Sequence, residues 1–348
     1  MAGILAIDQG TSSTKALVVG PDGMVLGEGN APVHPRASGG GAVEQQAQEL
    51  LDSIVQAGRD AIARARVAIE AVGIANQGET VLRWDRQSGR PLGTALSWQD
   101  RRAVTITREL AEHEDRLTAI TGLPLDPYFA GPKMAWLRRN EGEDGLVTTV
   151  DAWLNRQLTG AFVTDAATAS RTLLLDLERT EWSDEASSLF QLDPDSQPRI
   201  VDCAAAVGET EAFGPALPVT GLAVDQQAAL FAESCFDPGE AKCTYGTGAF
   251  ILATTGSVAP HSQSRLAACV AWRLDGSTTY CLDGQVYSAG SAVSWLQELD
   301  LISEAADLDR IGSDGGGETT FVPSLAGLGA PFWAPEARGG WLGLSGLR

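Results

Sequence analysis

Histidine and cysteine are scarce in this sequence, and no motif combines them. The chain has only three histidines and five cysteines, and no C-x-x-C pair occurs. A zinc site needs a cluster of such ligands, and a histidine-dependent triad needs a histidine that activates its nucleophile. The scattered histidines therefore argue against both. The odd cysteine count favours buried thiols in a reducing compartment over disulfides.

Basic residues and long apolar runs are also scarce. The 25 Lys and Arg residues are outnumbered by 45 Asp and Glu, which gives a net charge of −20. Such a surface repels nucleic acid and anionic membranes. No apolar stretch reaches the ~18 residues of a membrane span, and the N-terminal residues lack the pattern of a signal peptide. We therefore expect a cytoplasmic protein that binds neither nucleic acid nor membranes.

The length and the hydrophobic pattern predict a layered fold. With 348 residues, 44% of them hydrophobic, the chain is long enough for two domains. The pattern predicts strands at 24–33 and 71–75, a hairpin over 80–98, and helices over 43–66 and 147–158. Because strands and helices alternate, an α/β fold is favoured.

The first motif is a hairpin at the N-terminus. An apolar run ends at Asp8, and Gly10, four small hydroxyl residues and Lys15 precede a second apolar run. The hydroxyls and backbone N–H groups form a donor surface suited to phosphate oxygens, and Gly10 permits close approach. Asp8 is placed to hold a hydrated Mg²⁺. A plain hairpin with a polar turn is the alternative, but the order Asp-x-Gly-Thr followed by Lys favours phosphate binding.

A weaker copy of this hairpin occurs at 241–253, where strand, small-hydroxyl turn and strand follow one another. Two phosphate-type hairpins, one at the start of each half, suggest a duplicated architecture with nucleotide between the halves. The run Phe-Asp-Pro-Gly at 236–239 interrupts regular structure. We therefore place the boundary at 235–239, which predicts domains over 1–238 and 239–348.

Seven segments, taken together and in order, resemble the FGGY carbohydrate kinases of the actin/hexokinase-like superfamily, and glycerol kinases most closely. The resemblance covers the whole chain and is carried by residues 6–15, 73–84, 98–102, 122–129, 221–231, 244–248 and 327–343. It implies the duplicated actin-like ATPase (ribonuclease H-like) fold, with two domains around a cleft. The implied activity is ATP-dependent phosphorylation of a hydroxyl group of a small polyol or sugar, with Mg²⁺. Homo-oligomerisation is left open.

The resemblance also implies roles for substrate-side residues. Asp225 matches the catalytic base, which would accept the proton of the substrate hydroxyl during in-line phosphoryl transfer; its structural alternative is a helix N-cap. Glu79, Trp98 and Tyr128 match polyol-binding positions, as acceptor, stacking face and phenolic O–H. Gln226 would touch the substrate too. Core packing is the alternative for the two aromatic residues.

On the nucleotide side, six residues match phosphate and nucleotide contacts of the family: Thr11, Ser12, Lys15, Thr247, Gly248 and Gly290. Lys15 stands where glycerol kinases have an arginine, so the positive charge is kept but the bidentate fork is lost. Asp8 would hold Mg²⁺, through water. Ser294 replaces a family glutamine and is not counted as a site residue.

Gly78 departs from the family pattern, because glycerol kinases carry an arginine directly before the matched glutamate. A charged hydrogen bond to a polyol hydroxyl is worth about 1.5–3 kcal/mol, or roughly ten- to a hundred-fold in affinity. Its loss predicts weak glycerol binding. The missing side chain is also expected to open space for a larger polyol or sugar.

The end of the sequence leads to two alternative functions. Residues 240–348 are too few to complete the second domain of the family, so we expect a partial domain that lacks the adenosine pocket. Apolar strand faces and one sheet edge would then be uncovered. Either the sequence is part of a longer kinase, or it is a truncated, inactive polyol-binding or regulatory protein. An actin-like ATPase without a small substrate is disfavoured by residues 98–102 and 221–227.

Overall fold

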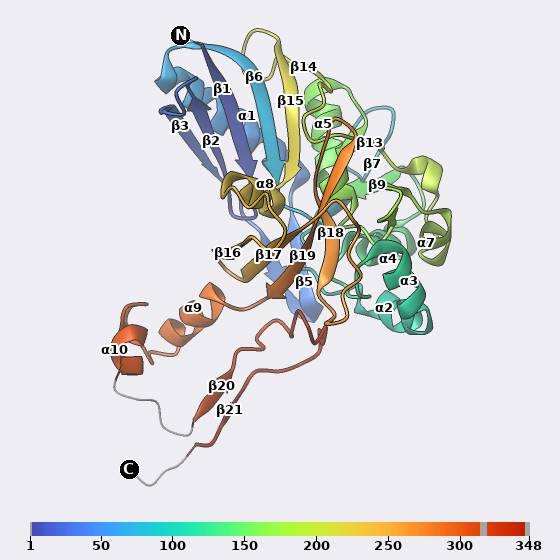
Figure 1. Cartoon of the computed structure of the whole chain (residues 1–348), viewed down its shortest axis with the longest axis vertical. Helices are drawn as coiled ribbons and strands as arrows, with labels where there is room; N and C mark the ends of the chain where they lie inside the picture. Colours follow the sequence, from blue (N-terminus) through green and yellow to red (C-terminus); the bar gives the residue numbers. More distant parts are fainter. Residues whose placement is uncertain (1, 314–318, 345–348) are drawn as a thin grey trace.

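The computed structural model describes residues 2–313 and 319–344. The first half is built on one large sheet, and the second half on a smaller sheet that lies beside its lower end (Figure 1). Helices of the middle of the chain lie to one side of both sheets, and the last described elements extend away from them. None of the described helices combines the length and the apolar character that crossing a membrane requires.

The large sheet has six strands in the order β14-β15-β6-β1-β2-β3. β1 and β2 form the predicted N-terminal hairpin, in which Asp8 is opposite Lys15. The strands are β1 (Ala2–Gln9), β2 (Ser13–Val19), β3 (Val25–Pro32), β6 (Ala68–Asn76), β14 (Gly208–Thr210) and β15 (Leu217–Val224). The predicted strands at 24–33 and 71–75 are thereby confirmed.

Three parallel strands of this sheet end at the same level. Gln9 of β1 is in register with Asn76 of β6, which is in register with Val224 of β15. The residues that follow these strands therefore leave the sheet at one edge. In open α/β sheets this carboxyl edge is where ligands bind.

One face of the large sheet is covered by helix α1 (Ala47–Ala65). Leu5 and Ile7 of β1 join Leu50 and Ile54 of α1 in one buried cluster. The helix starts later than predicted because residues 42–45 pair as a strand instead. On the opposite face Ile4 is 51% exposed, and apolar side chains line an open groove of about 570 Å³. Phe231 and Trp272 also line this groove, so other elements cover part of that face.

A second sheet, of five strands, lies next to the middle helices in the order β4-β5-β8-β7-β9. Its strands are β4 (Arg36–Ser38), β5 (Ala42–Gln45), β7 (Val81–Trp84), β8 (Ala95–Leu96) and β9 (Leu146–Thr149). β7 and β8 confirm the predicted hairpin. The helix predicted from 147 starts at 150 instead, because residues 146–149 pair with β7 as a strand.

The middle of the chain supplies most of the helices and two short strand pairs, β10–β13 and β11–β12. The helices are α2 (Val104–Glu109), α3 (Glu114–Thr121), α4 (Ala130–Glu141), α5 (Val150–Thr159), α6 (Ala166–Ala169), α7 (Asp184–Leu189) and α8 (Asp225–Ala232). The short strands are β10 (Val163–Asp165), β11 (Leu175–Asp176), β12 (Glu181–Trp182) and β13 (Arg199–Val201). Three 3₁₀ turns accompany them: η1 (Gly39–Gly41), η2 (Ala111–His113) and η3 (Pro194–Ser196).

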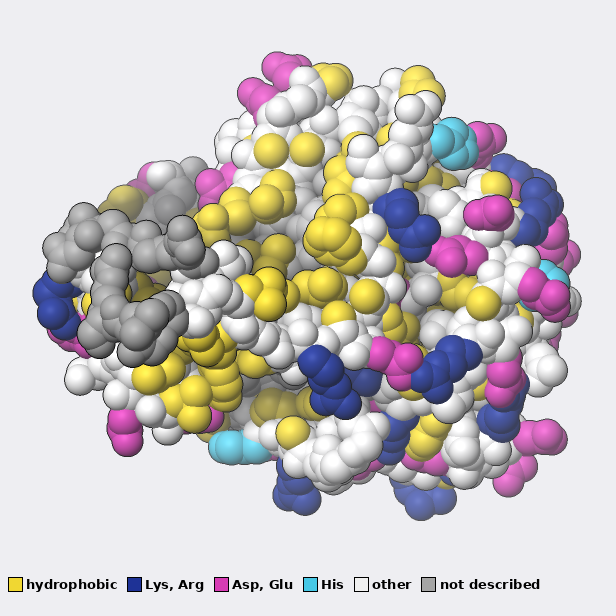
Figure 2. All heavy atoms as spheres, turned by 90° about the horizontal axis from the view of Figure 1, so that it is seen from below, with side chains coloured by type: hydrophobic (Ala, Val, Ile, Leu, Met, Phe, Trp, Pro, Cys, Tyr) yellow, Lys and Arg dark blue, Asp and Glu magenta, His cyan; other side chains and the backbone are white. Residues whose placement is uncertain are grey.

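The second half contains a four-stranded antiparallel sheet in the order β16-β17-β19-β18. Its first two strands are the predicted second hairpin. The elements are β16 (Ala241–Tyr245), β17 (Ala249–Gly256), β18 (Ala267–Leu274), β19 (Ser277–Val286), α9 (Gly290–Glu298), α10 (Asp307–Ser313), β20 (Thr320–Val322) and β21 (Gly340–Leu342). Apolar side chains gather on the lower face of the molecule (Figure 2). Tyr245 and Phe332 of this half are 81% and 66% exposed.

Candidate functional site

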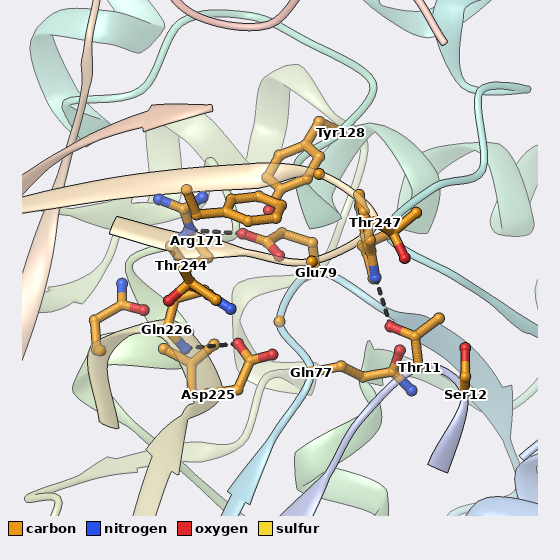
Figure 3. A pocket seen from close by; sticks show the side chains of 17 residues that line it. Thr11, Ser12, Gln77, Glu79, Tyr128, Arg171, Asp225, Gln226, Thr244 and Thr247 are labelled. Atoms are coloured by element: carbon orange, nitrogen blue, oxygen red, sulfur yellow. Dashed lines mark hydrogen bonds and ion pairs between the residues drawn. The ribbon is translucent and has the colours of Figure 1, made fainter. Parts of the chain in front are cut away.

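A cavity of about 250 Å³ lies where the carboxyl edge of the large sheet meets the turn of the second hairpin. The two hairpin turns and the substrate-side residues face it together (Figure 3). Nine of the predicted site residues line this cavity: Thr11, Ser12, Glu79, Trp98, Tyr128, Asp225, Gln226, Thr247 and Gly248. Residues far apart in the sequence are thus brought into one place.

Three predicted site residues lie outside the cavity. Asp8 and Lys15 line the neighbouring groove, on the face of the large sheet opposite α1. Gly290 lies behind the second turn, where its N–H donates to the carbonyl of Gly246 at 2.9 Å. A Cβ at Gly290 would lie 2.5 Å from that oxygen, so the turn and the start of α9 fit together only without a side chain there.

Asp225 is the first residue of α8 and is partly buried beside the cavity. Its Oδ1 accepts a hydrogen bond from the backbone N–H of Gln226 at 2.7 Å. The helix N-cap is Val224, and no side chain caps the helix, so Asp225 does not act as an N-cap. Burial, followed by the negative charges of Glu79 and Asp8, raises the pKa of Asp225 to about 7. A carboxylate with such a pKa is suited to accept a proton near neutral pH.

Glu79 is buried and has a left-handed backbone, with φ of 54°. Its Oε1 accepts a hydrogen bond from Nε of Arg171 at 2.5 Å, and Nη2 of Arg171 lies 2.9 Å from Oδ2 of Asp283. Burial raises the pKa of Glu79, and the charge of Arg171 acts against that rise. Glu79, Arg171 and Asp283 therefore form a buried row of alternating charges that reaches β19.

Aromatic residues form the wall opposite the acids. The Trp98 ring meets Tyr128 and Phe250 edge-on, with centroids 5.9 Å apart in each pair. The indole N–H of Trp98 donates to the hydroxyl of Thr11 at 2.8 Å. The wall thus touches the first phosphate-type turn directly, and one of its rings comes from the second half of the chain.

Gln226 is held by a cation of the second hairpin. Nζ of Lys242, on β16, donates to Oε1 of Gln226 at 2.6 Å and to the hydroxyl of Thr244 at 2.8 Å. Burial lowers the pKa of Lys242. Lys242 holds Oε1, and the amide nitrogen of Gln226 can donate to a ligand.

The space beside Gly78 is limited on one side by Val224. A Cβ at Gly78 would lie 2.9 Å from Cγ2 of Val224, and Val224 is 2% exposed. Gly78 itself lines the cavity, so the room expected at this position exists but is limited on one side by an apolar side chain of β15. Position 78 offers a ligand neither a cation nor a polar side chain.

Sequence reasoning missed Arg171, Phe250 and Lys242. Arg171 is a single cation in the small and apolar run 166–175, and an isolated charge in such a run is typical of a buried, paired residue. That signal was available. Phe250 and Lys242 carry no comparable signal, because each reaches the site only through the packing of the second hairpin on the first half.

The residues fit Mg²⁺ only as an ion held largely by water and phosphate. Among residues 2–313 and 319–344, no group of three or more His, Cys, Asp or Glu side chains could hold a metal ion. Mg²⁺ is commonly bound through one or two carboxylates with water and substrate phosphates. Asp8, at the end of β1 and opposite Lys15, suits such a binding mode.

Comparisons with known proteins define the class of protein: a carbohydrate kinase of the actin-like ATPase fold. Residues 3–232 match the N-terminal domain of the FGGY family of carbohydrate kinases, and residues 241–346 match its C-terminal domain. The chain therefore belongs to the FGGY family of carbohydrate kinases.

Among its relatives, a glycerol kinase of Allorhizobium ampelinum is 42% identical, and one of Xanthobacter autotrophicus is 43% identical. Each match covers 98% of this chain and 73% of the relative. The structure of a Plasmodium falciparum glycerol kinase with ADP is 30% identical, with a TM-score of 0.89, and the match covers 100% of this chain and 74% of that one. The chain thus spans about three quarters of the length of these kinases.

Proposed function

We propose that this chain carries the substrate site and both phosphate loops of a kinase that transfers phosphate from ATP to a hydroxyl group of a small polyol or sugar. The observation that carries the proposal is the meeting of Asp225 and Glu79 with the turns at Thr11 and Thr247 in one cavity. Family membership and the likeness to a glycerol kinase structure with ADP support it.

The chemistry follows from the positions of these groups. Glu79 accepts hydrogen bonds from hydroxyl groups of the bound polyol, and the side-chain amide of Gln226 contacts the polyol as well. Asp225 accepts the proton of the attacking hydroxyl, and a pKa of about 7 lets it do so at neutral pH. The N–H groups and hydroxyls of Thr11, Ser12 and the second turn donate to phosphate oxygens. Mg²⁺, held through water by Asp8, would neutralise phosphate charge.

We infer that glycerol is a poor substrate. Gly78 supplies no donor where glycerol kinases have arginine, and Val224 covers that position with an apolar side chain. A substrate that presents carbon rather than hydroxyl to Val224 suits this wall, while its hydroxyls reach Glu79 and Gln226. Tight glycerol binding without preference for longer polyols would contradict the inference.

The deciding experiment is a screen of glycerol, tetritols, pentoses and hexoses, in which ATP-dependent phosphate transfer and ligand binding are both measured. D225N serves as the control and should bind polyol without transferring phosphate. Wild-type protein that neither binds nor phosphorylates any of these compounds would refute the proposal.

A second candidate is a polyol-binding protein without turnover. It is favoured by one observation: Glu79, Trp98, Tyr128, Asp225 and Gln226 line one cavity, and these side chains can bind a polyol whether or not phosphate is transferred. The same screen separates the candidates, because polyol binding without transfer in the wild-type chain supports the second one.

We also propose a cytoplasmic location, which the free state of all five cysteines supports. We further propose a domain boundary at 235–239.

A further inference from the structure

Arg171 is a buried cation that the proposed function leaves without a role. It lies just after α6, is 3% exposed and lines the cavity. Nε binds Oε1 of Glu79, Nη2 pairs with Asp283 at 2.9 Å, and Nη1 points to Sγ of Cys269 at 3.5 Å. Its guanidinium carbon also lies 5.7 Å from the centre of the Tyr128 ring. The side chain is thus fixed on several sides while it faces the ligand space (Figure 3).

We propose that Arg171 is the positioning residue that sets polyol affinity and its pH range, by holding Glu79 ionised with one oxygen turned to the substrate. The inference rests on the proposed function. Oε1 of Glu79 is taken by Arg171, and none of the described residues forms a hydrogen bond with Oε2. Oε2 is therefore the acceptor that remains for a hydroxyl group of the ligand.

The position of Gly78 makes Arg171 more important. In this chain the residue before Glu79 has no side chain, and the nearest atom to a Cβ at that position is Cγ2 of Val224, at 2.9 Å. The positive charge that supports Glu79 consequently comes from behind the carboxylate instead of from beside the ligand. Arg171 does not replace the missing donor to the substrate; it keeps the acceptor charged.

The charges around Glu79 show why the acceptor depends on Arg171. The charged or titratable groups that face it are Arg171, Lys133 of α4, Asp283 of β19, Asp225 of α8 and Tyr128. Burial raises the pKa of Glu79, Asp283 raises it further, and Arg171 opposes both more strongly than Lys133 does. Burial lowers the pKa of Lys133 to about 7. Above that pH this lysine loses its positive charge and no longer helps Arg171 to keep Glu79 ionised. Without Arg171, Glu79 would take up a proton at higher pH and lose its acceptor role as the pH falls.

A matched control is available in Arg102. It also has two carboxylate partners, Asp100 and Glu44, both at 2.7 Å, and it lies over the Trp136 ring. It does not line the cavity. A substitution at Arg102 removes the ion pairs with Asp100 and Glu44 and leaves the surroundings of Glu79 unchanged.

The test measures binding of glycerol, erythritol and xylitol to the full chain by calorimetry between pH 6 and 9, with folding checked by circular dichroism. R171M should weaken binding of the best ligand at least tenfold at pH 8, and binding should fall further toward pH 6 than in the wild type. R171K should retain the wild-type pH dependence with a smaller loss, and R102M should change neither quantity. Adding R171M to E79Q should have little further effect, because Arg171 acts through the Glu79 charge.

Each outcome is decisive. If R171M keeps the wild-type affinity and pH dependence, or if its effect adds fully to that of E79Q, the role of Arg171 is overturned while the proposed function stands. If R171M does not fold, R171K decides: an affinity and pH profile equal to the wild type would overturn the inference. Absence of binding by the wild type at every pH would overturn the proposed function and this inference with it.

Discussion

The indole N–H of Trp98 donates a hydrogen bond to the hydroxyl of Thr11, with 2.8 Å between the two heavy atoms. Trp98 belongs to the aromatic wall of the substrate space, and Thr11 to the first phosphate-type turn. The bond therefore joins the two halves of the site before any ligand binds. Gln45 supports the same turn, because its amide donates to the carbonyl of Thr11 at 2.9 Å.

W98F keeps an aromatic ring at this position but should weaken polyol binding, because the bond to Thr11 is lost. A hydrogen bond of this kind contributes about 0.5–1.5 kcal/mol, which corresponds to a loss of up to about tenfold. A double-mutant cycle with T11V, measured by calorimetry without nucleotide, isolates the pair. We expect the double variant to bind about as well as W98F alone. Fully additive losses would mean that the bond does not support the substrate wall.

The second phosphate-type turn contains two glycines, Gly246 and Gly248, and only Gly248 lacks room for a side chain. A Cβ at Gly248 would lie 2.6 Å from the carbonyl oxygen of Val286, whereas a Cβ at Gly246 would meet nothing closer than 3.9 Å. G248A should destabilise the fold by about 1–3 kcal/mol, while G246A should stay within about 0.5 kcal/mol of the wild type. Thermal melts of both variants measure the difference. Equal melting temperatures would show that the backbone of the turn adjusts freely.

The pKa of Asp225 predicts opposite trends for activity and stability. Since the base must be ionised, phosphate transfer should rise with pH up to about 7 and then level off. Because the pKa of Asp225 in the folded protein is raised above the ordinary aspartate value of 3.8, the folded protein retains a proton that the unfolded chain has lost. Stability should therefore fall as the pH rises from about 4 to about 7 and stay constant above.

D225N tests both trends. Transfer should drop by roughly 10²–10⁴-fold, while polyol binding persists. The melting temperature of D225N should exceed that of the wild type above pH 7, and the gap should shrink toward pH 4, where the wild-type carboxyl is neutral as well. A gap that widens on acidification would show that the carboxylate is stabilised, and not strained, in the folded protein.

Local patterns predicted the elements that carry the phosphate-type turns. Both hairpins have apolar runs beside a turn of small residues, so β1–β2 and β16–β17 were expected from the sequence. The start of α5 was not, because residues 146–149 have an apolar pattern that suits either a strand or a helix. Pairing with β7, which is distant in the sequence, decides in favour of a strand.

The site residues also divide into those that the local sequence predicts and those that depend on contacts between distant segments. Residues next to a strand end, such as Glu79 and Asp225, could be assigned by position and resemblance. Phe250 and Lys242 could not, because their role arises only when the second hairpin packs on the first half. The effect of Gly78 was predicted only in part. Its missing charge is visible in the sequence, but its contact with Val224 depends on the register of β6 and β15.

The contact between Gly78 and Val224 makes a prediction about glycerol. An arginine at position 78 alone should not improve glycerol binding, because even its Cβ would lie 2.9 Å from Cγ2 of Val224. Removing the valine side chain as well should make room, so G78R/V224G should bind glycerol more tightly than the wild type. A gain of at least tenfold is expected from one charged hydrogen bond of about 1.5–3 kcal/mol. V224G alone serves as the control and should not gain affinity, because it adds space without a donor. Glycerol affinity that rises in G78R alone would show that Val224 yields, and that the missing arginine is the whole difference.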